Sequence, residues 1–258
     1  MQHSRKIRYI IAFLLLSISV LVFVAMNVCI GTVKISLEDI IASIGGGQIN
    51  NSRILWDIRM PRTMAAMILG GALALAGYLL QTFFHNPIAG PFVLGISSGA
   101  KMVVALVMVF LMGQAIRVSS VTLIAAAFLG AMISMGFVLL MSRKVNNMSM
   151  LVVSGVMIGY ICSAVTELVV TFANDAEIVN LHNWSRGSFS GMTWDNVIVM
   201  AVVITVTFVI VFFMAKPLSA YQLGESYAQN MGVNIRLLRV ALVILSSILS
   251  ACIVAFAG

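Results

Sequence analysis

Long apolar stretches separated by short polar segments dominate the hydropathy pattern of this 258-residue chain. Each stretch is close to the roughly 20 residues that an α-helix needs to cross a bilayer. There are seven, at residues 9–30, 63–84, 92–113, 119–141, 150–172, 197–215 and 240–257. The pattern predicts an all-α fold, a polytopic transmembrane helical bundle that forms a single domain over residues 1–258.

The overall composition excludes a water-soluble globular protein. Hydrophobic residues make up 61% of the chain and charged residues only 9%, whereas soluble domains carry roughly 25% charged residues. The net charge of +7 is spread over the ends of the predicted spans. A nucleic-acid surface would gather its basic residues on one face, so we expect no nucleic-acid partner.

The basic N-terminus predicts the orientation of the chain in the membrane. Arg5, Lys6 and Arg8 precede the first span, and Arg143 and Lys144 follow the fourth. Basic residues favour the cytoplasmic side, so we expect a cytoplasmic N-terminus. The first apolar run is longer than the 7–15 residues of a signal peptide and lacks a cleavage pattern, so we interpret it as a retained helix.

The potential metal-binding and catalytic side chains are scattered. The three cysteines and three histidines lie far apart, which predicts neither a disulfide framework nor a metal site. The cysteines are interpreted as small buried apolar residues. No catalytic combination of side chains is recognisable, so we expect no enzyme activity and no cofactor bound by this chain.

Three polar segments are long enough to hold structure of their own. Residues 31–62 and 173–196 are predicted outside, and residues 216–239 are predicted in the cytoplasm. In the last of these, Leu223 and Tyr227 share one helical face with Met231. This spacing predicts a short amphipathic helix that ends near Gly232, with a second helix starting near Asn234. Such a pair either docks a partner protein or lies on the lipid headgroups.

Small residues recur along the second predicted span. Ala66, Gly70 and Ala74 lie four positions apart, and Ala72 and Ala76 mark a second face. Small residues let helices approach closely inside a membrane, where no hydrophobic driving force acts between them. We therefore expect this span in the interior of a bundle.

A polar interruption follows this span at His85, Asn86 and Pro87. Proline lacks an N–H and disfavours helical geometry in the residue before it. The simpler interpretation is an ordinary loop before a glycine-rich helix. The alternative is a re-entrant turn beside a transport pathway, because non-helical backbone at membrane depth needs protein or a watery cavity around it.

Glu167 is the one acidic residue inside a predicted span. An intramembrane carboxylate is a functional candidate by default, and here it is a candidate for the pathway. A position in a wet cavity near the interface would explain it equally well.

Several segments together resemble a known family. They are IRMPRTMAAMILGGALALAGYLLQ and FFHNPIAGPFVLGISSGA within residues 58–100, LVVSGVMIGYICSA at 151–164, WSRGSFSGMTWD at 184–195 and LGESYAQNMGV at 223–233. In this order they resemble the permease subunits of type II ABC importers for iron-siderophores, haem and cobalamin. Such permeases have about ten spans of roughly 20 residues. The chain resembles the first seven, so we expect it to be incomplete at its C-terminus.

The resemblance implies a role for several residues. Arg59 and Arg62 would dock the substrate-binding protein, since the arginine fork suits carboxylates. The cytoplasmic gate would comprise Asn86, Ile88, Met148 and Ser149, although Met148 departs from the small hydroxyl residues common there. Contact with the ATPase through the 216–239 coupling segment would use Gly224, Glu225, Ala228 and Gly232.

The resemblance also implies the cellular setting. The permease would lie in the bacterial inner (plasma) membrane, surrounded by the lipid bilayer, with an ATP-binding subunit dimer, an extracytoplasmic substrate-binding protein and a second permease subunit. ATP would bind the ATPase subunit. Its expected cargo is an iron-siderophore; the alternatives are haem or cobalamin. A secondary transporter is less favoured, because that class builds coupling-ion sites from buried polar residues near the midplane.

Overall fold

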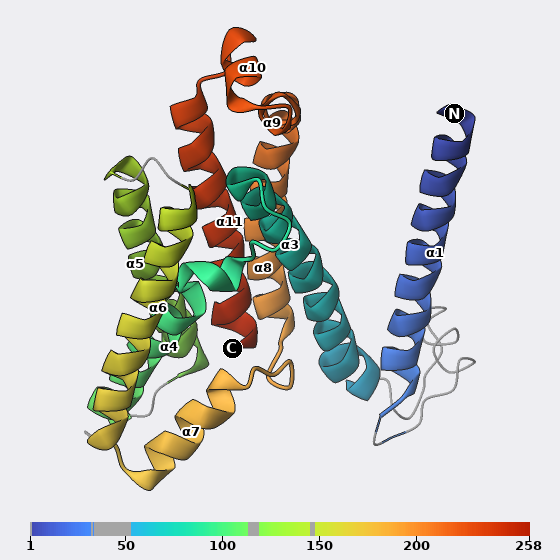
Figure 1. Ribbon diagram of the computed structural model, residues 1–258. Helices are drawn as coiled ribbons and strands as arrows, with labels where there is room; N and C mark the ends of the chain where they lie inside the picture. The colour runs from blue at the N-terminus through green and yellow to red at the C-terminus, as the bar shows by residue number, and fades with distance from the viewer. Residues whose placement is uncertain (1, 32, 34–52, 113–118, 145–147) are drawn as a thin grey trace. The chain divides into compact units, whose positions relative to one another are not determined.

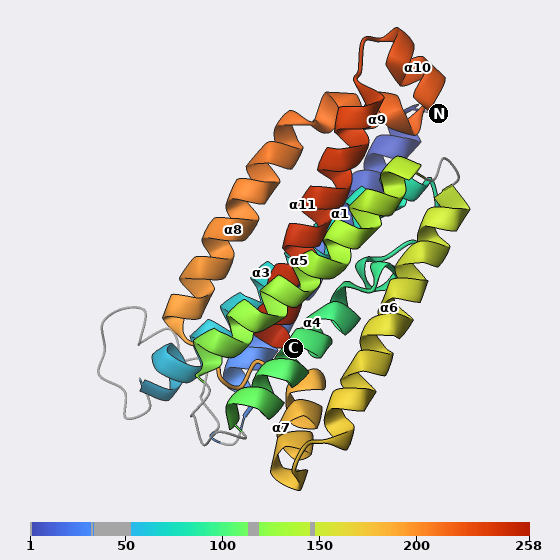
Figure 2. The same ribbon diagram turned by 90° about the vertical axis from the view of Figure 1, so that its left-hand side faces the viewer.

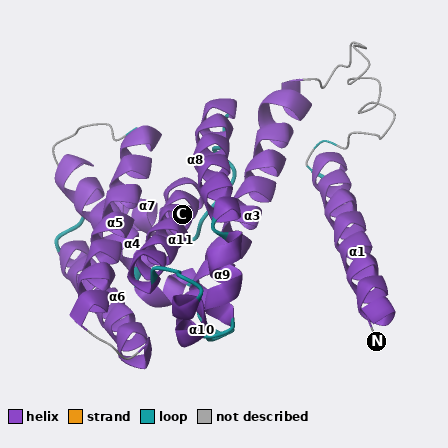
Figure 3. Cartoon of the chain, turned by 90° about the horizontal axis from the view of Figure 1, so that it is seen from above, coloured by secondary structure: helices purple, strands orange, loops and turns teal. Residues whose placement is uncertain are grey.

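The computed structural model describes most of the chain as α-helix (Figure 1). The described residues are 2–31, 33, 53–112, 119–144 and 148–258. Within them, six helices are long and apolar enough to cross a membrane, and a shorter apolar helix covers Ile96–Leu111. Every regular element in the described residues is helical (Figure 3). The predicted all-α transmembrane fold is confirmed.

The chain divides into two compact units. The first comprises Met1–Met67 with Ser190–Val197, and the second comprises Ile68–Phe189 with Ile198–Gly258. Two helices, α3 (Met60–Phe84) and α8 (Trp194–Phe213), begin in the first unit and continue into the second.

The first unit is held together by polar contacts near helix ends. It contains α1 (Gln2–Cys29) and a π-helical turn, η1 (Ile54–Arg59). Thr63 Oγ1 donates a hydrogen bond of 2.8 Å to Asn27 Oδ1 near the end of α1. Trp194 Nε1 donates one of 2.9 Å to the Trp56 carbonyl. Val28 of α1 packs on Leu55 and Met60, and most other apolar side chains of α1 are exposed.

The second unit is built around four helices that lie side by side (Figures 1 and 2). They are α4 (Ile96–Val107), α5 (Ser120–Lys144), α6 (Met148–Thr171) and α11 (Ile235–Ala257). Small residues allow the closest approach: a Cβ on Gly130 would lie 2.2 Å from the Gly99 carbonyl oxygen. Cys162 and Cys252 are buried in this unit, as interpreted from the sequence, whereas Cys29 in the first unit is only partly buried.

Three short helices lie at the ends of the second unit. Helix α7 (Asp175–Ser185) is at the end opposite to α9 (Ala215–Gln222) and α10 (Glu225–Asn230) (Figures 1 and 2). Asn174 and Glu177 form a capping box at the start of α7, which satisfies backbone N–H groups that a helix start leaves free.

The chain after α3 returns into the bundle before it becomes helical again. A single turn of 3₁₀ helix, η2 (Pro91–Leu94), precedes Gly95, which has φ +69°. A Cβ on Gly95 would lie 2.8 Å from the backbone nitrogen of Gly159, about halfway along α6. The irregular backbone is therefore covered by protein at this depth, which favours the re-entrant interpretation.

This turn also explains why the third expected span differs from the prediction. Residues 92–113 were expected to cross the membrane, but the α-helix begins only at Ile96 and α4 has 12 residues. It continues into a π-helical turn, η3 (Met108–Met112), so the apolar helix Ile96–Leu111 covers roughly 24 Å of a hydrocarbon core that is about 30 Å thick. The first part of the apolar stretch is not α-helical, because it contains the 3₁₀ turn that begins at Pro91 and the left-handed Gly95.

The small residues of α3 do not all serve the packing that we expected. Ala72 and Ala76 are fully buried. Gly70 and Ala74 are exposed, and a Cβ on Gly70 would meet nothing within 4 Å. Only the Ala72–Ala76 face therefore lies in the interior of this chain.

The close approach of α4 and α5 makes a testable prediction. Gly130→Ala should destabilise the folded permease by roughly 1–3 kcal/mol, because the new methyl group overlaps backbone that cannot yield easily. Gly136→Ala on the same helix is the matched control, since a Cβ there meets nothing within 4 Å. Thermal unfolding of the purified protein in detergent should show a lower midpoint for Gly130→Ala alone. Equal midpoints for both variants would contradict the packing described.

Candidate gate and coupling site

The gate loop, residues 85–90, forms a compact turn at the end of α3. His85 has φ +49°, the one positive φ outside glycine among the described residues. Asn86 closes the turn: its N–H donates to the Gln81 carbonyl at 3.2 Å, and its Oδ1 accepts the Ile88 N–H at 3.0 Å. Ile88 is 86% exposed. The loop therefore presents one large apolar side chain on a hydrogen-bonded base.

An open hollow of about 350 Å³ lies beside the gate loop. Its lining residues are Tyr78, Gln81, Thr82, His85, Asn86, Pro87 and Gln222. Most of these side chains are polar, and Gln222 belongs to α9. The predicted gate and the predicted coupling segment thus share one surface, although more than 130 positions of the chain separate them.

The coupling segment is bent at two glycines. Gly224 has φ +125° and Gly232 has φ +84°, a region that side-chain-bearing residues rarely adopt. Between them lies α10, whose Ala228 is fully buried. Of the predicted coupling residues, Gly232 is exposed, Gly224 and Glu225 are half-buried, and Ala228 is buried.

The predicted amphipathic helix of this segment was wrong in one respect. Leu223, Tyr227 and Met231 do not share a helix, because Gly224 separates α9 from α10. The three side chains are nevertheless exposed, at 71%, 50% and 62%. The second predicted helix is the start of the long α11, capped by Asn234, whose Oδ1 accepts the Leu237 N–H at 3.1 Å.

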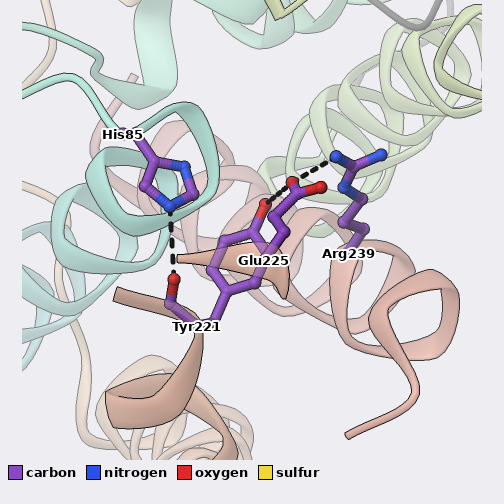
Figure 4. A network of polar contacts seen from close by, with 4 residues as sticks. All are labelled: His85, Tyr221, Glu225 and Arg239. Atoms are coloured by element: carbon purple, nitrogen blue, oxygen red, sulfur yellow. Dashed lines mark hydrogen bonds and ion pairs between the residues drawn. The ribbon is translucent and has the colours of Figure 1, made fainter. Parts of the chain in front are cut away.

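A polar network holds the segment against α11 (Figure 4). Glu225 forms an ion pair with Arg239 on α11, and the Tyr221 hydroxyl donates a hydrogen bond of 3.0 Å to the same carboxylate oxygen. His85 extends the network to the gate loop. Its Nε2–H donates to the Tyr221 carbonyl at 3.3 Å, and the two rings lie 4.7 Å apart.

The network sets the protonation of its members. Burial raises the pKa of Tyr221 to about 12, and the Glu225 carboxylate adds to this effect. The phenol therefore stays a hydrogen-bond donor at physiological pH. Burial by itself would raise the pKa of Glu225, but the hydrogen bonds from Arg239 and Tyr221 outweigh it and lower the pKa below its ordinary value of 4.5.

Comparison with known proteins identifies this architecture. Residues 18–258 match the FecCD transport family. The chain belongs to the FecCD family. It is 32% identical, over 257 residues, to the vitamin B12 import system permease protein BtuC of Salmonella typhi and to that of Salmonella paratyphi A. The alignments cover 100% of this chain and 75% of each relative.

A solved structure supports the same assignment. It is described as an inward-facing conformation of a metal-chelate type ABC transporter, and it superposes with a TM-score of 0.80 at 26% identity. The match covers 94% of this chain and 74% of that one. The chain is therefore a type II ABC importer permease subunit, a membrane transport protein of a class that works with ATPase and substrate-binding partners.

The two arginines of the FecCD chain predicted to dock a binding protein have different surroundings. Arg59 is only 8% exposed, and its guanidinium donates to the carbonyl of Val28 in the last turn of α1 and to that of Val33 beyond it. Arg62 is half-buried and donates 2.7 Å to the Ser190 carbonyl. Arg59 thus caps α1, whereas Arg62 keeps part of its surface available.

Three other predicted sites of the FecCD chain stay predictions. Met148 and Ser149 open α6, beside residues 145–147, which lie outside the described part of the chain. Glu167 lies on the exposed face of α6, a position compatible with both of its interpretations.

Sequence reasoning missed His85, Tyr221 and Arg239. The opposite charges of Glu225 and Arg239 within one polar segment could have indicated an ion pair. Pairing them from the sequence would also have required knowledge of the bend at Gly232, which brings the two residues together. His85 and Tyr221 are 136 positions apart, and their pairing depends on how α3 meets α9.

The lowered pKa of Glu225 predicts a pH-dependent stability difference. A carboxylate with a lowered pKa stabilises the fold above its unfolded-state pKa, and this contribution is lost as the pH falls through the folded-state value. Glu225→Gln should therefore lower the unfolding midpoint at pH 7, and the difference from wild type should shrink below about pH 4.5. Thermal unfolding of both proteins across this range checks it. A constant difference at every pH would show that the carboxylate charge contributes nothing.

Proposed function

We propose that this permease subunit moves a ferric siderophore into the bacterial cell, driven by ATP that a separate subunit hydrolyses. The observation that carries the transport mechanism is the contact between the gate loop and the coupling segment at one end of the second unit. An ATPase subunit that binds the coupling segment would therefore act directly beside the gate loop. The siderophore itself rests on the family resemblance and on the metal-chelate description of the solved structure.

A second cargo, cobalamin, is favoured by a specific observation. Two relatives that align over the whole of this chain at 32% identity are vitamin B12 permeases. Cobalamin and ferric siderophores are both large metal complexes, so one permease architecture serves either. Cargo choice depends on pathway side chains, among which Glu167 is our candidate.

The ATPase would bind the exposed apolar stripe of the coupling segment. Leu223, Tyr227 and Met231 project from a bent segment that is fixed underneath by the buried Ala228 and the paired Glu225. Large apolar side chains gathered on a polar segment are typical of a docking surface. Glu225, Ala228 and the two glycines then act by shaping this surface.

The remaining parts of the assembly follow from the family. A second permease subunit, identical or paralogous, would complete the pathway between the two subunits. The N-terminus and the 216–239 segment would face the cytoplasm, and Arg62 would face the extracytoplasmic binding protein. Residues 1–258 would act as one permease domain.

Uptake into proteoliposomes tests the proposed cargo. The permease is reconstituted with its ATPase and binding protein, and radiolabelled ferric siderophore and cobalamin are offered separately, with and without ATP. ATP-dependent accumulation of the siderophore supports the proposal. Accumulation of cobalamin alone would transfer the assignment to the second candidate, and accumulation of neither would contradict both.

The ATPase-docking surface makes its own prediction. Met231→Asp should weaken binding of the ATPase subunit on the order of tenfold, because it places a charge in a desolvated contact. Ser219→Asp, at an exposed position of α9 outside the stripe, is the matched control. Binding of the purified ATPase to permease in nanodiscs provides the measurement. Equal affinity of both variants and wild type would rule out this stripe as the docking surface.

The two arginines should respond differently to charge reversal. Arg62→Glu should weaken capture of the binding protein several-fold at low salt and less at high salt, because exposed charges act over a screened range. Arg59→Glu should instead lower the unfolding midpoint, since it places a carboxylate against the Val28 and Val33 carbonyls.

Affinity measured at two ionic strengths, together with thermal unfolding, separates the two effects. If Arg62→Glu left capture unchanged at low salt, its docking role would be excluded. If Arg59→Glu unfolded at the wild-type temperature, its capping role would be excluded.

A further inference from the structure

Two polar ties join the end of α3 to α9. The first is His85, whose ring packs against the Tyr221 ring at an angle of 51° and donates to the Tyr221 carbonyl. The second is Gln222, whose Nε2 donates to the Tyr78 hydroxyl at 3.2 Å and to Thr82 Oγ1 at 3.1 Å. Of these five side chains, only His85 also belongs to the gate loop.

The backbone at His85 sets the direction of the gate loop. A φ of +49° is uncommon outside glycine, and asparagine, aspartate and histidine adopt it most readily. At this residue the chain leaves α3, and the next residue, Asn86, begins the turn that carries Ile88. The backbone conformation of His85 therefore determines both the direction of the gate loop and the position of the His85 ring.

The Tyr221 carbonyl is the other half of this contact. It accepts the Gly224 N–H at 3.0 Å, which closes the bend between α9 and α10, and it accepts His85 Nε2–H with its second lone pair. The Tyr221 ring is fully buried, and its hydroxyl reaches Glu225. One residue thus joins the bend, the ion pair on α11 and the gate loop.

We propose that His85 is a positioning residue of the transport cycle, which holds the gate loop to the α9–α10 bend so that a displacement of the coupling segment carries Asn86 and Ile88 with it. This inference rests on the proposed role of that segment in docking the ATPase. The residues that it joins are 136 positions apart in the chain. Motion therefore passes between them through contacts between side chains and backbone. Among the described residues, His85 makes the polar contact that ends in the gate loop, and the buried Ala89 adds an apolar contact with the core.

Hydrogen exchange on the purified full chain in lipid nanodiscs tests the link. The reporters are the amides of Ile88 and Ala89, which donate to Asn86 Oδ1 and to the Asn86 carbonyl. Local opening of this turn sets their exchange rate. Glu225→Gln and, as a milder change, Tyr221→Phe disturb the coupling side of the network. Each is measured alone and combined with His85→Asn.

His85→Asn is chosen because asparagine tolerates the same backbone conformation but is too short to pack against the Tyr221 ring or to reach the Tyr221 carbonyl. Ser219→Ala on α9 is the matched control, since Ser219 bonds only the Ala215 carbonyl of its own helix. His85→Phe keeps an aromatic ring and loses the Nε2 donor, so it separates the ring contact from the hydrogen bond.

We expect Glu225→Gln and Tyr221→Phe to accelerate exchange at Ile88 and Ala89 about fivefold when His85 is present, and less than about twofold when it is combined with His85→Asn. His85→Phe should retain part of the effect, and Ser219→Ala should have none. Equal acceleration with and without His85→Asn, or no acceleration by either coupling-side variant, would overturn the proposal. The experiment needs no ATPase, binding protein or cargo, so a failed uptake assay leaves this result intact.

Discussion

A bilayer offers no hydrogen-bond partners, so every backbone group that leaves a helix inside this bundle must be satisfied or covered by protein. The gate loop and the chain that follows it meet this constraint in two ways. Asn86 bonds the turn internally, and Gly95 brings the irregular chain directly against the backbone of α6 at Gly159. The short α4 and its packing on α5 and α6 follow from that arrangement. Because its backbone groups must stay bonded or covered, the gate loop cannot move independently. It can respond to ATP binding at the ATPase only by moving with the elements that it contacts.

Residues of the coupling segment fall into two groups: some shape the segment, and others are exposed on its surface. Gly224 and Gly232 set the bends, Ala228 fills the space beneath, and Glu225 pairs with Arg239. Together they form a base from which Leu223, Tyr227 and Met231 project. Under the proposed function, these exposed side chains bind the ATPase while the base transmits the force. The two arginines differ in the same way: Arg59 caps α1, whereas the side chain of Arg62 stays partly exposed and can contact a partner.

The sequence predicted the helical membrane fold, the structured coupling segment and the unusual turn at Asn86–Pro87, because each depends on local properties: hydrophobic length, small residues and proline geometry. It did not predict where α4 begins, since a left-handed Gly95 depends on contact with Gly159 from another helix. Nor did it predict that Gly70 would be exposed while Ala72 is buried, because both faces of α3 carry small residues. The His85–Tyr221 contact was equally hidden, since it depends on how two distant helices meet. The docking, gating and coupling roles of the predicted site residues stay predictions.

Under the proposed function and the His85 link, the coupling segment and the gate loop move as one rigid body. Spin labels at Tyr227→Cys and Ile88→Cys within one subunit, with the three native cysteines replaced, measure this directly by pulsed electron resonance in the assembled transporter. If the two segments move together, the distance between these labels stays constant when ATP binds, while the distance between Ile88→Cys labels on the two permease subunits changes. A change of the Tyr227–Ile88 distance within one subunit on ATP binding would contradict it.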